Sequence, residues 1–558
     1  MYNYKFQNQY IFANKTSNIS EDDNKSNQEE INEEIGSILN ELLLNLTNHN
    51  KEAKYYLNKI SDIAGKYDIC NHPLFISNSI YTMILTLFSP NVPFPIILSA
   101  SSAISSFSYL FSSDSYIGSP FNIDNLYLIL QPETISFIFN CIEEKCSKEI
   151  SAFTLMLRKY CTVSRKFRDI LISEITIESM CEIIKHGIQK NAEIGWVTCL
   201  ISLLCDICLY PINNSQISSI LELFDNFDLF SLTYDVNYIV IHTMRYIIEN
   251  NDIKPINNIN SNQNNNENQG SIHLLMKSKI LTLFDPLLNQ IKMKQKYNSD
   301  LDHQKYFNKI EDDICGVSLS VYFLTDKHVL IIPIKRFIDF LQNPEDSIVY
   351  NALTFFSVYA IESKENYDEC NKNSFFSYLE NCIQFRSAKI RIHAGHFVAE
   401  IIFKADDTLL SNLIYQHFFI PSFDLIQFGD TKLSIEMLHV MQLFIQFVMK
   451  KSDQNLASIL NDVYNHSDIE NILDDLLDLE VESDDQAGKD LYNAAYLTHS
   501  LFEEFFSTFH FINNENENNE NEFHYLSFNE NEDFNLFDDE NSSSQDKYFM
   551  DTKPNKWT

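Results

Sequence analysis

A chain of 558 residues exceeds what one compact core usually holds, so its length predicts several domains or one extended array of repeats. Its 10 glycines leave little room for the glycine-rich loops that cradle phosphates or form nucleophile turns, which argues against those classes of enzyme. A net charge of −36 argues against direct binding to nucleic acid or to an anionic membrane surface, and it favours basic protein partners.

The N-terminal segment, residues 1–28, is polar and rich in Asn, Ser and Glu, and we predict that it is disordered. Its first 20 residues lack the apolar core of a secretory signal. The 11 cysteines lie mostly in apolar helical runs, which indicates free buried thiols in a reducing compartment. The most apolar region, residues 79–100, is interrupted by three prolines, so we expect no membrane insertion. We expect a cytoplasmic protein, with shuttling to the nucleus as an open alternative.

Helical patterning begins near Ile31 and continues to about Phe509, and we predict one armadillo-like helical repeat domain over residues 29–510. The Asn-rich segment 251–270 is expected to be a loop inserted into this domain. Residues 511–558 alternate acidic and aromatic side chains and are expected to form a disordered tail.

Long apolar segments recur at residues 347–365, 389–407 and 432–450, at offsets of 42 and 43 residues. Each follows a shorter apolar segment, and these are Val329–Leu341, Phe375–Ile383 and Ile420–Phe428. A short helix and then a long one, at a period near 42 residues, is typical of armadillo and HEAT arrays. We therefore predict an all-α fold, a right-handed α-solenoid of armadillo/HEAT-like repeats in which each unit buries its apolar face against its neighbours.

Three local patterns have both a chemical and a structural interpretation. Cys205 and Cys208 have redox spacing but lie in an apolar helical run, which favours a place in the core. His393, His396 and Glu400 share one helix face and have metal-ligand side chains, but a surface position on a repeat helix is favoured. A basic cluster is interpreted as a solvated face, with docking of an acidic segment such as the tail as the alternative. Its members are Arg158, Lys159, Arg165, Lys166 and Arg168.

Residues 376–454 resemble the C-terminal armadillo repeats of importin-α. Within them, residues 413–445 follow that family's order of a short helix, an I-P-x-x-D-L helix, a D-x-K turn and a long Leu-rich helix. Residues 469–506 are similar to its terminal helix pair, and residues 194–206 to one of its early repeats. The basic segment that precedes the repeats in that family has no counterpart in residues 1–50.

The resemblance implies a concave groove lined by the third helix of each repeat, where Trp and Asn ladders hold a peptide. Only Trp196 keeps a ladder residue, since the remaining ladder places carry other side chains. Trp196 and His242 are expected at equivalent places, 46 residues apart. As the resemblance implies, the groove candidates are Trp196, His242, Arg245, Tyr246, His396 and Glu400.

We predict a non-enzymatic adaptor that binds protein or peptide segments in this groove, with an importin-α-like role in nuclear transport. The alternative is a structural or regulatory helical-repeat scaffold in a cytoskeletal, vesicle, phosphatase or kinase complex. No phosphate-loop, dinucleotide, nucleophile-elbow or zinc-protease motif occurs in the sequence. We therefore predict no catalytic residue, no cofactor and no metal, and expect basic proteins or peptides as partners rather than nucleic acid.

Overall fold

The computed structural model describes residues 21–47, 52–64, 79–89, 91–107, 132–145, 150–190, 192–251, 270–297, 301–325, 327–415, 423–466, 469–478 and 485–509. Every regular element within these ranges is a helix, which confirms the all-α class. Residues 1–20, residues 252–269 of the Asn-rich segment and the acidic-aromatic tail lie outside the described residues. Contacts divide the chain into the units Met1–Phe502 and Glu503–Thr558, and the repeats described below belong to the first.

The helices follow one another along the chain with short connections. Their bounds are α1 Glu21–Thr47, α2 Ala53–Ala64, α4 Ser79–Leu85, α5 Phe94–Ser106, α6 Pro132–Lys145, α7 Ser151–Val163, α8 Arg165–Glu174, α9 Ile177–Gln189, α10 Ile194–Ile207, α11 Asn214–Asp225, α12 Tyr234–Asn251, α13 Gly270–Leu275, η6 Lys279–Leu283, α14 Phe284–Tyr297, α15 Leu301–Leu324, α16 Ile334–Leu341, α17 Asp346–Glu362, α18 Lys364–Lys372, α19 Phe375–Phe385, α20 Ala388–Lys404, α21 Asp407–Tyr415, α23 Thr431–Lys451, α24 Gln454–His466, α25 Ile469–Leu477 and α26 Gln486–Phe509.

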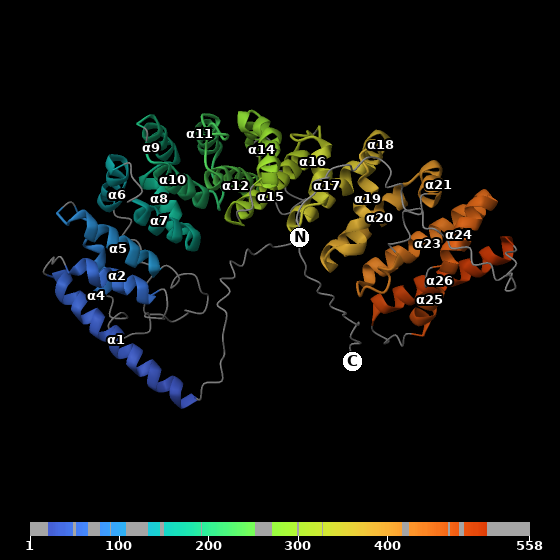
Figure 1. The fold of residues 1–558 in the computed structure, drawn as a ribbon, viewed down its shortest axis with the longest axis horizontal. Helices are drawn as coiled ribbons and strands as arrows, with labels where there is room; N and C mark the ends of the chain where they lie inside the picture. The colour runs from blue at the N-terminus through green and yellow to red at the C-terminus, as the bar shows by residue number, and fades with distance from the viewer. Residues whose placement is uncertain are drawn as a thin grey trace, which may run out of the picture. The chain divides into compact units, whose positions relative to one another are not determined.

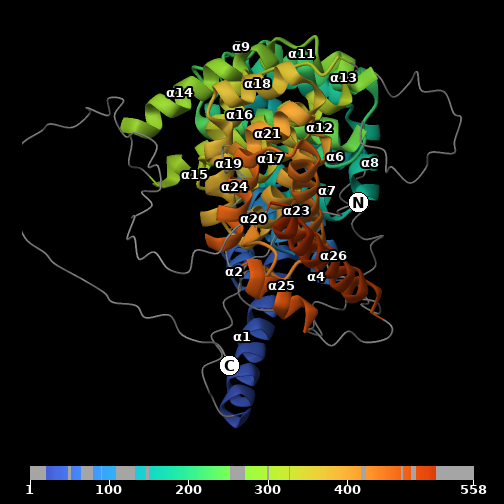
Figure 2. The ribbon, with the colours of Figure 1, turned by 90° about the vertical axis from the view of Figure 1, so that its right-hand side faces the viewer.

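The helices pack in two rows. In the first, which we call the long-helix row, α5, α7, α10, α12, α15, α17, α20 and α23 each contact the next (Figure 1). Shorter helices, among them α9, α11, α16, α19, α21 and α24, form the second row beside it, and Figure 2 shows both rows from the end. Contacts are mainly between neighbours in a row or between rows, which is how a solenoid builds one continuous core.

The repeat register expected from the sequence is visible in burial. Ala352 in α17, Ala394 in α20 and Met437 in α23, at the predicted offsets, are all fully buried. The short helix α16 packs its aromatic face on the following long helix, with the rings of Phe337 and Phe355 stacked 3.8 Å apart. Apolar residues at helical spacing therefore bury one face of each helix against the neighbouring repeat.

Three expected elements differ in the structure. For the short helix expected over Ile420–Phe428, residues 424–427 form turns instead. Helix α1 begins at Glu21, so residues 21–28 are helical although the sequence predicts disorder up to residue 28. The short helix expected over residues 329–341 begins only at Ile334, because His328 has a left-handed backbone (φ 48°) and Pro333 occupies the N-cap position.

Helix α23 is long and apolar enough to cross a membrane by length and composition, with a mean hydropathy of 1.2 in its most apolar window. Of that window, 56% is buried inside the protein, where α23 packs on α20 and α24. The apolar residues of α23 are thus accounted for by packing in the core.

Candidate protein-binding surface on the long helices

Trp196 is not a groove residue, which corrects the expectation from the sequence. Its side chain is fully buried, and the indole Nε1 donates a hydrogen bond to the carbonyl oxygen of Ile142 in α6 at 2.8 Å. Leu200, one turn later, is buried too, whereas His242 lies at a partly exposed position. Trp196 contacts the preceding helix α6 and His242 the following helix α15, so the two side chains do not occupy equivalent environments.

The other predicted residues of α12 meet two adjacent carboxylates of α15. His242 Nδ1 lies 2.9 Å from Asp313 Oδ2. Arg245 Nη1 donates to Asp312 Oδ2 at 2.9 Å and to Asp313 Oδ1 at 3.0 Å. Its Nε donates to Glu249 at 2.8 Å within α12. The Asp313 side chain is only 3% exposed, so this carboxylate is stabilised by direct contact with both α12 side chains.

The α12–α15 junction brings three carboxylates to Arg245, with the ammonium group of Lys309 close by. Burial lowers the pKa of Arg245, but Glu249, Asp312 and Asp313 outweigh it and raise that pKa above its ordinary value. Three carboxylates therefore face one guanidinium. The side chains of Asp312 and Glu249 are 25% and 35% exposed, so part of the negative charge is accessible to solvent.

Aromatic rings lie beside these charges. The His242 ring stacks on Tyr238, with centroids 5.0 Å apart, and the Tyr246 ring lies tilted beside it at 4.3 Å. The ammonium group of Lys309 lies 5.0 Å from the centre of the Tyr238 ring. Burial, followed by neighbouring ionisable groups, raises the pKa of both tyrosines, so their hydroxyl groups keep their protons. The junction thus offers aromatic faces and carboxylates together, an arrangement that suits a cation.

A second group lies farther along the row. His393 Nε2 is 3.1 Å from Thr354 Oγ1 of α17, and its ring stacks on Tyr350 at 4.3 Å. Burial, then the nearby His396 and Lys389, lower the pKa of His393 to about 4. The predicted groove residues His396 and Glu400 bond elsewhere: His396 Nδ1 is 2.6 Å from Glu436 of α23, and Glu400 accepts from Lys404.

These contacts belong to a series that connects successive long helices from α7 to α26, and we call it the polar chain. Where the importin-α resemblance implies side chains directed at a peptide, the side chains of this row bond the next helix. The polar chain consists of Arg158–Asp206, Asn250–Cys208, His242 and Arg245 with Asp312 and Asp313, Asn351–Asp312, Thr354–His393, His396–Glu436, and Gln442 with Ala494 and Thr498.

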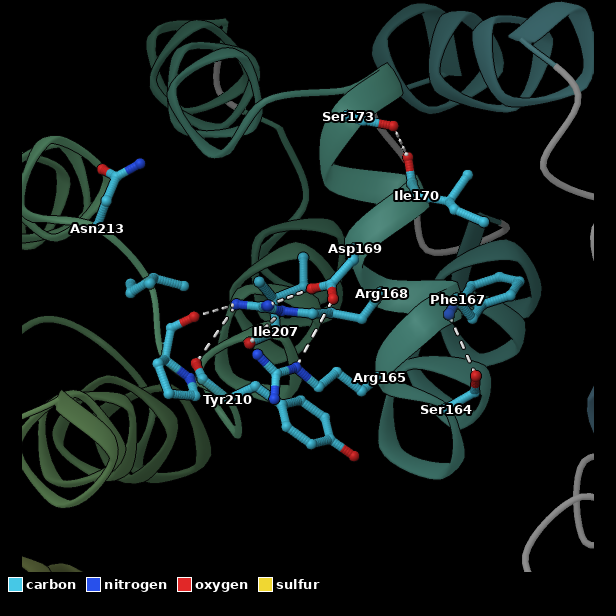
Figure 3. Close-up of polar contacts among 12 residues, drawn as sticks. Ser164, Arg165, Phe167, Arg168, Asp169, Ile170, Ser173, Ile207, Tyr210 and Asn213 are labelled. Atoms are coloured by element: carbon cyan, nitrogen blue, oxygen red, sulfur yellow. Dashed lines mark hydrogen bonds and ion pairs between the residues drawn. The ribbon is translucent and has the colours of Figure 1, made fainter. Parts of the chain in front are cut away.

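The basic cluster is largely used within the fold, contrary to its interpretation as a solvated face. Arg168 is 4% exposed and donates to the carbonyl oxygens of Ile207 and Pro211 at 3.2 and 2.9 Å. Figure 3 shows its side chain directed at the end of α10, with Asp169 beside it. Its guanidinium therefore satisfies carbonyl groups that a helix C-terminus leaves unpaired.

Two further members of the cluster also bond within the protein. Arg158 pairs with Asp206 at 2.6 Å, and Lys159 donates to the carbonyl oxygen of Ser105. Burial lowers the pKa of Lys159. Arg165 is exposed and lies 3.7 Å from Asp169. Arg165 and Lys166 are thus the exposed members of the cluster.

The cysteine pair is part of the core, as expected. Cys205 and Cys208 are buried, and burial raises the pKa of the Cys205 thiol to about 12 and that of Cys208 well above its usual value. Both are thus neutral thiols of low reactivity. His393, His396 and Glu400 bond three different partners, and no group of metal-ligating side chains converges within the described ranges.

No model of a known protein family matches this sequence, and no curated protein matches it. Among solved structures, an engineered protein is similar over 84% of this chain and 99% of its own, with 10% identity and a TM-score of 0.56. A designed armadillo repeat protein matches 48% of this chain and 99% of its own, with 11% identity and a TM-score of 0.34. A chain from a structure of the interaction between cadherin and β-catenin matches 83% of this chain and 80% of its own, at 11% identity and a TM-score of 0.44.

The likeness to the engineered protein concerns the fold, and it agrees with the two rows of helices and their repeat register. The class that these observations define is an all-α solenoid of armadillo/HEAT-like repeats. This confirms the fold class expected from the sequence.

Proposed function

We propose that this chain is a non-enzymatic scaffold that binds a protein or peptide segment along the exposed side of its long-helix row. The observation that carries the proposal is the α12–α15 junction, where tyrosine rings and partly exposed carboxylates lie together. Solenoids commonly use such continuous helix surfaces for extended contacts. The groups here suit contact rather than a reaction, because the nearby Cys205 is a buried thiol whose pKa burial raises to about 12.

The partner segment is proposed to be basic. Three carboxylates face the guanidinium of Arg245, and the exposed parts of Asp312 and Glu249 can accept an added Lys or Arg side chain. Lys309 over the ring of Tyr238 is an internal example of the same contact. The net charge of −36 would also speed the approach of a basic partner.

Titration with a fluorescent Lys/Arg-rich peptide at several salt concentrations tests the proposal. We expect binding that weakens as salt rises, and at least a fivefold loss, about 1 kcal/mol, in Glu249→Gln or Tyr246→Ala. Glu182→Gln on the second-row helix α9, where the carboxylate is 72% exposed, is the matched control and should bind normally. Binding reduced equally by Glu182→Gln and Glu249→Gln would indicate a general charge effect and contradict the proposed surface.

An importin-α-like transport role is the narrower form of this proposal, supported by the resemblance of residues 376–454. The interior position of Trp196 and the internal bonding of the polar chain require a mode of peptide contact different from that family's ladders. Recovery of a β-karyopherin with the tagged protein from its own cells would support transport. Recovery of cytoskeletal, coat or phosphatase components would favour the structural or regulatory scaffold.

We also propose a cytoplasmic location, with nuclear entry only in the transport form. The proposal rests on the free buried thiols, which suit a reducing compartment. Fluorescence microscopy of the tagged full chain, with nuclear export blocked, distinguishes the two forms. Nuclear accumulation would support shuttling, and a signal in the secretory pathway would contradict both.

A further inference from the structure

A buried carboxyl group joins α15 to the connection between α16 and α17. The side chain of Glu311 in α15 is 9% exposed and accepts a hydrogen bond from Asn343 Nδ2 at 2.7 Å. Asn343 in turn accepts from the backbone N–H of Glu345 at 2.9 Å, one residue before α17 begins. Glu311 thus contacts the segment that sets where the next long helix starts.

The groups that face Glu311 come from three elements. Lys292 and Gln295 belong to α14, Asp339 to α16, and Asn343 to the connection that follows. Lys292 is committed to Asp339, with Nζ and Oδ2 3.2 Å apart. No described cation forms an ion pair with Glu311, so its direct partners are neutral amides. An ionised carboxylate in such a place is costly, whereas a protonated carboxyl is not.

We infer that the contact of α15 with the α16–α17 connection is a proton-operated junction: it is tight when the Glu311 carboxyl carries a proton and weakened when the group is ionised. Protonation leaves an oxygen that still accepts from Asn343 and removes the cost of a buried charge. Ionisation restores that cost, which opening of the junction to water relieves. The junction therefore responds to the binding and release of a single proton.

The range of this response follows from the pKa. Burial raises the pKa of Glu311 to about 7; Asn343, Lys292 and Gln295 oppose the rise and Asp339 adds to it. The folded-state pKa lies above the unfolded value, so the stabilisation is complete below the unfolded pKa near 4.5 and is lost as pH rises through about 7. The opening equilibrium should change by about two orders of magnitude over this range, since each pKa unit is a factor of ten.

The change in packing at Glu311 reaches the polar chain through Asp312, the next residue of α15. Asp312 accepts from Asn351 of α17 at 3.2 Å and from Arg245 of α12 at 2.9 Å. A looser start of α17 displaces Asn351 relative to Asp312, because both belong to the same pair of helices. One carboxyl group thus couples pH to the packing of two successive long helices.

Hydrogen exchange of the full chain, compared with Glu311→Gln, tests the junction. The amide keeps an acceptor for Asn343 but cannot ionise. At about pH 4 the backbone amides of α17 should exchange equally in both proteins, and at about pH 8 the variant should be protected at least about tenfold more. Glu365→Gln, at an exposed position in α18, is the control and should match the parent at both pH values. Equal exchange of parent and Glu311→Gln at both pH values would overturn the inference.

A second variant keeps Glu311 itself. Lys292 lowers the pKa of Glu311, so Lys292→Gln should move the midpoint of the pH response to higher pH by a few tenths of a unit or more. The readout is the pH dependence of α17 exchange, corrected with an unstructured reference peptide. A midpoint that does not move, or that moves down, would contradict the assignment of the response to Glu311.

Discussion

Gly187 in α9 lies against the indole ring of Trp196 in α10: a Cβ atom added at Gly187 would be 2.3 Å from two carbons of the six-membered ring. The ring is fully buried, and its Nε1 is bonded to Ile142, so it has little freedom to move away. The glycine is therefore required by packing between the two helices rather than by its backbone conformation.

Gly187→Ala should destabilise the protein by about 1–3 kcal/mol through overpacking, although alanine favours a helix by about 1 kcal/mol. Urea unfolding followed by circular dichroism measures the loss. The combined variant with Trp196→Leu removes the opposing ring, so it should lose less than the sum of the two single changes. If the losses of the two single variants simply added in the double variant, the contact between residue 187 and the indole ring would not be the cause of the destabilisation.

Arg168→Met should cost about 2–4 kcal/mol, because the carbonyl groups of Ile207 and Pro211 lose a buried charged donor. Arg168→Lys should restore little, since an ammonium group cannot reproduce the planar fork of donors. Thermal denaturation compares these with Arg165→Ala, whose exposed parent side chain predicts a change within about 0.5 kcal/mol. Equal effects at both positions would contradict the role given to Arg168.

The two neighbouring aspartates of α15 should differ in their contribution to stability. Asp313 is nearly inaccessible and bonds both His242 and Arg245, so Asp313→Asn should cost about 3–5 kcal/mol. Asp312 is 25% exposed, and Asp312→Asn should cost about 1 kcal/mol. Denaturant midpoints measured in parallel provide the comparison. A larger loss for Asp312→Asn would mean that the exposed pair, not the buried one, holds α12 against α15.

Acidification should weaken the α17–α20 contact through His393. Its folded-state pKa of about 4 lies below the unfolded value of 6.5, so the folded state resists protonation and stability is lost as pH falls through this interval. The loss should reach roughly 2 kcal/mol at about pH 5. His393→Gln lacks the titrating group and should have a flatter profile from about pH 7 to 5 in thermal denaturation. If the stability of the parent and of His393→Gln fell in parallel with pH, the loss could not be assigned to His393.

Much of the fold was predictable because its repeats are regular in α17, α20 and α23. A constant offset keeps small and apolar residues such as Ala352 and Ala394 in the same environment, so the pattern alone indicates which face is buried. The start of α1 was placed too late because polar residues before Ile31 carry no apolar periodicity, although helical structure extends through them.

The candidate surface was predictable only in part. His242, Arg245, Tyr246 and His396 do lie at partly exposed positions of long helices. The prediction that Trp196 lines the groove was wrong. A helix turns by about 100° per residue, so a small error in an assumed repeat offset moves a side chain to another face. Asp312 and Asp313 were missed because the inserted segment separates them from His242 by about 70 residues, well beyond the repeat period.

Backbone continuity is not what holds α12 against α15. Helix α12 ends at Asn251 and the next described helix begins at Gly270, yet Arg245 and His242 bond directly to α15. A chain cleaved once between residues 252 and 269 should therefore remain one particle whose fragments migrate together until denaturant separates them. The same property would allow the two fragments to be produced from separate messages and to assemble by recognition of each other's helices, as a natural split protein.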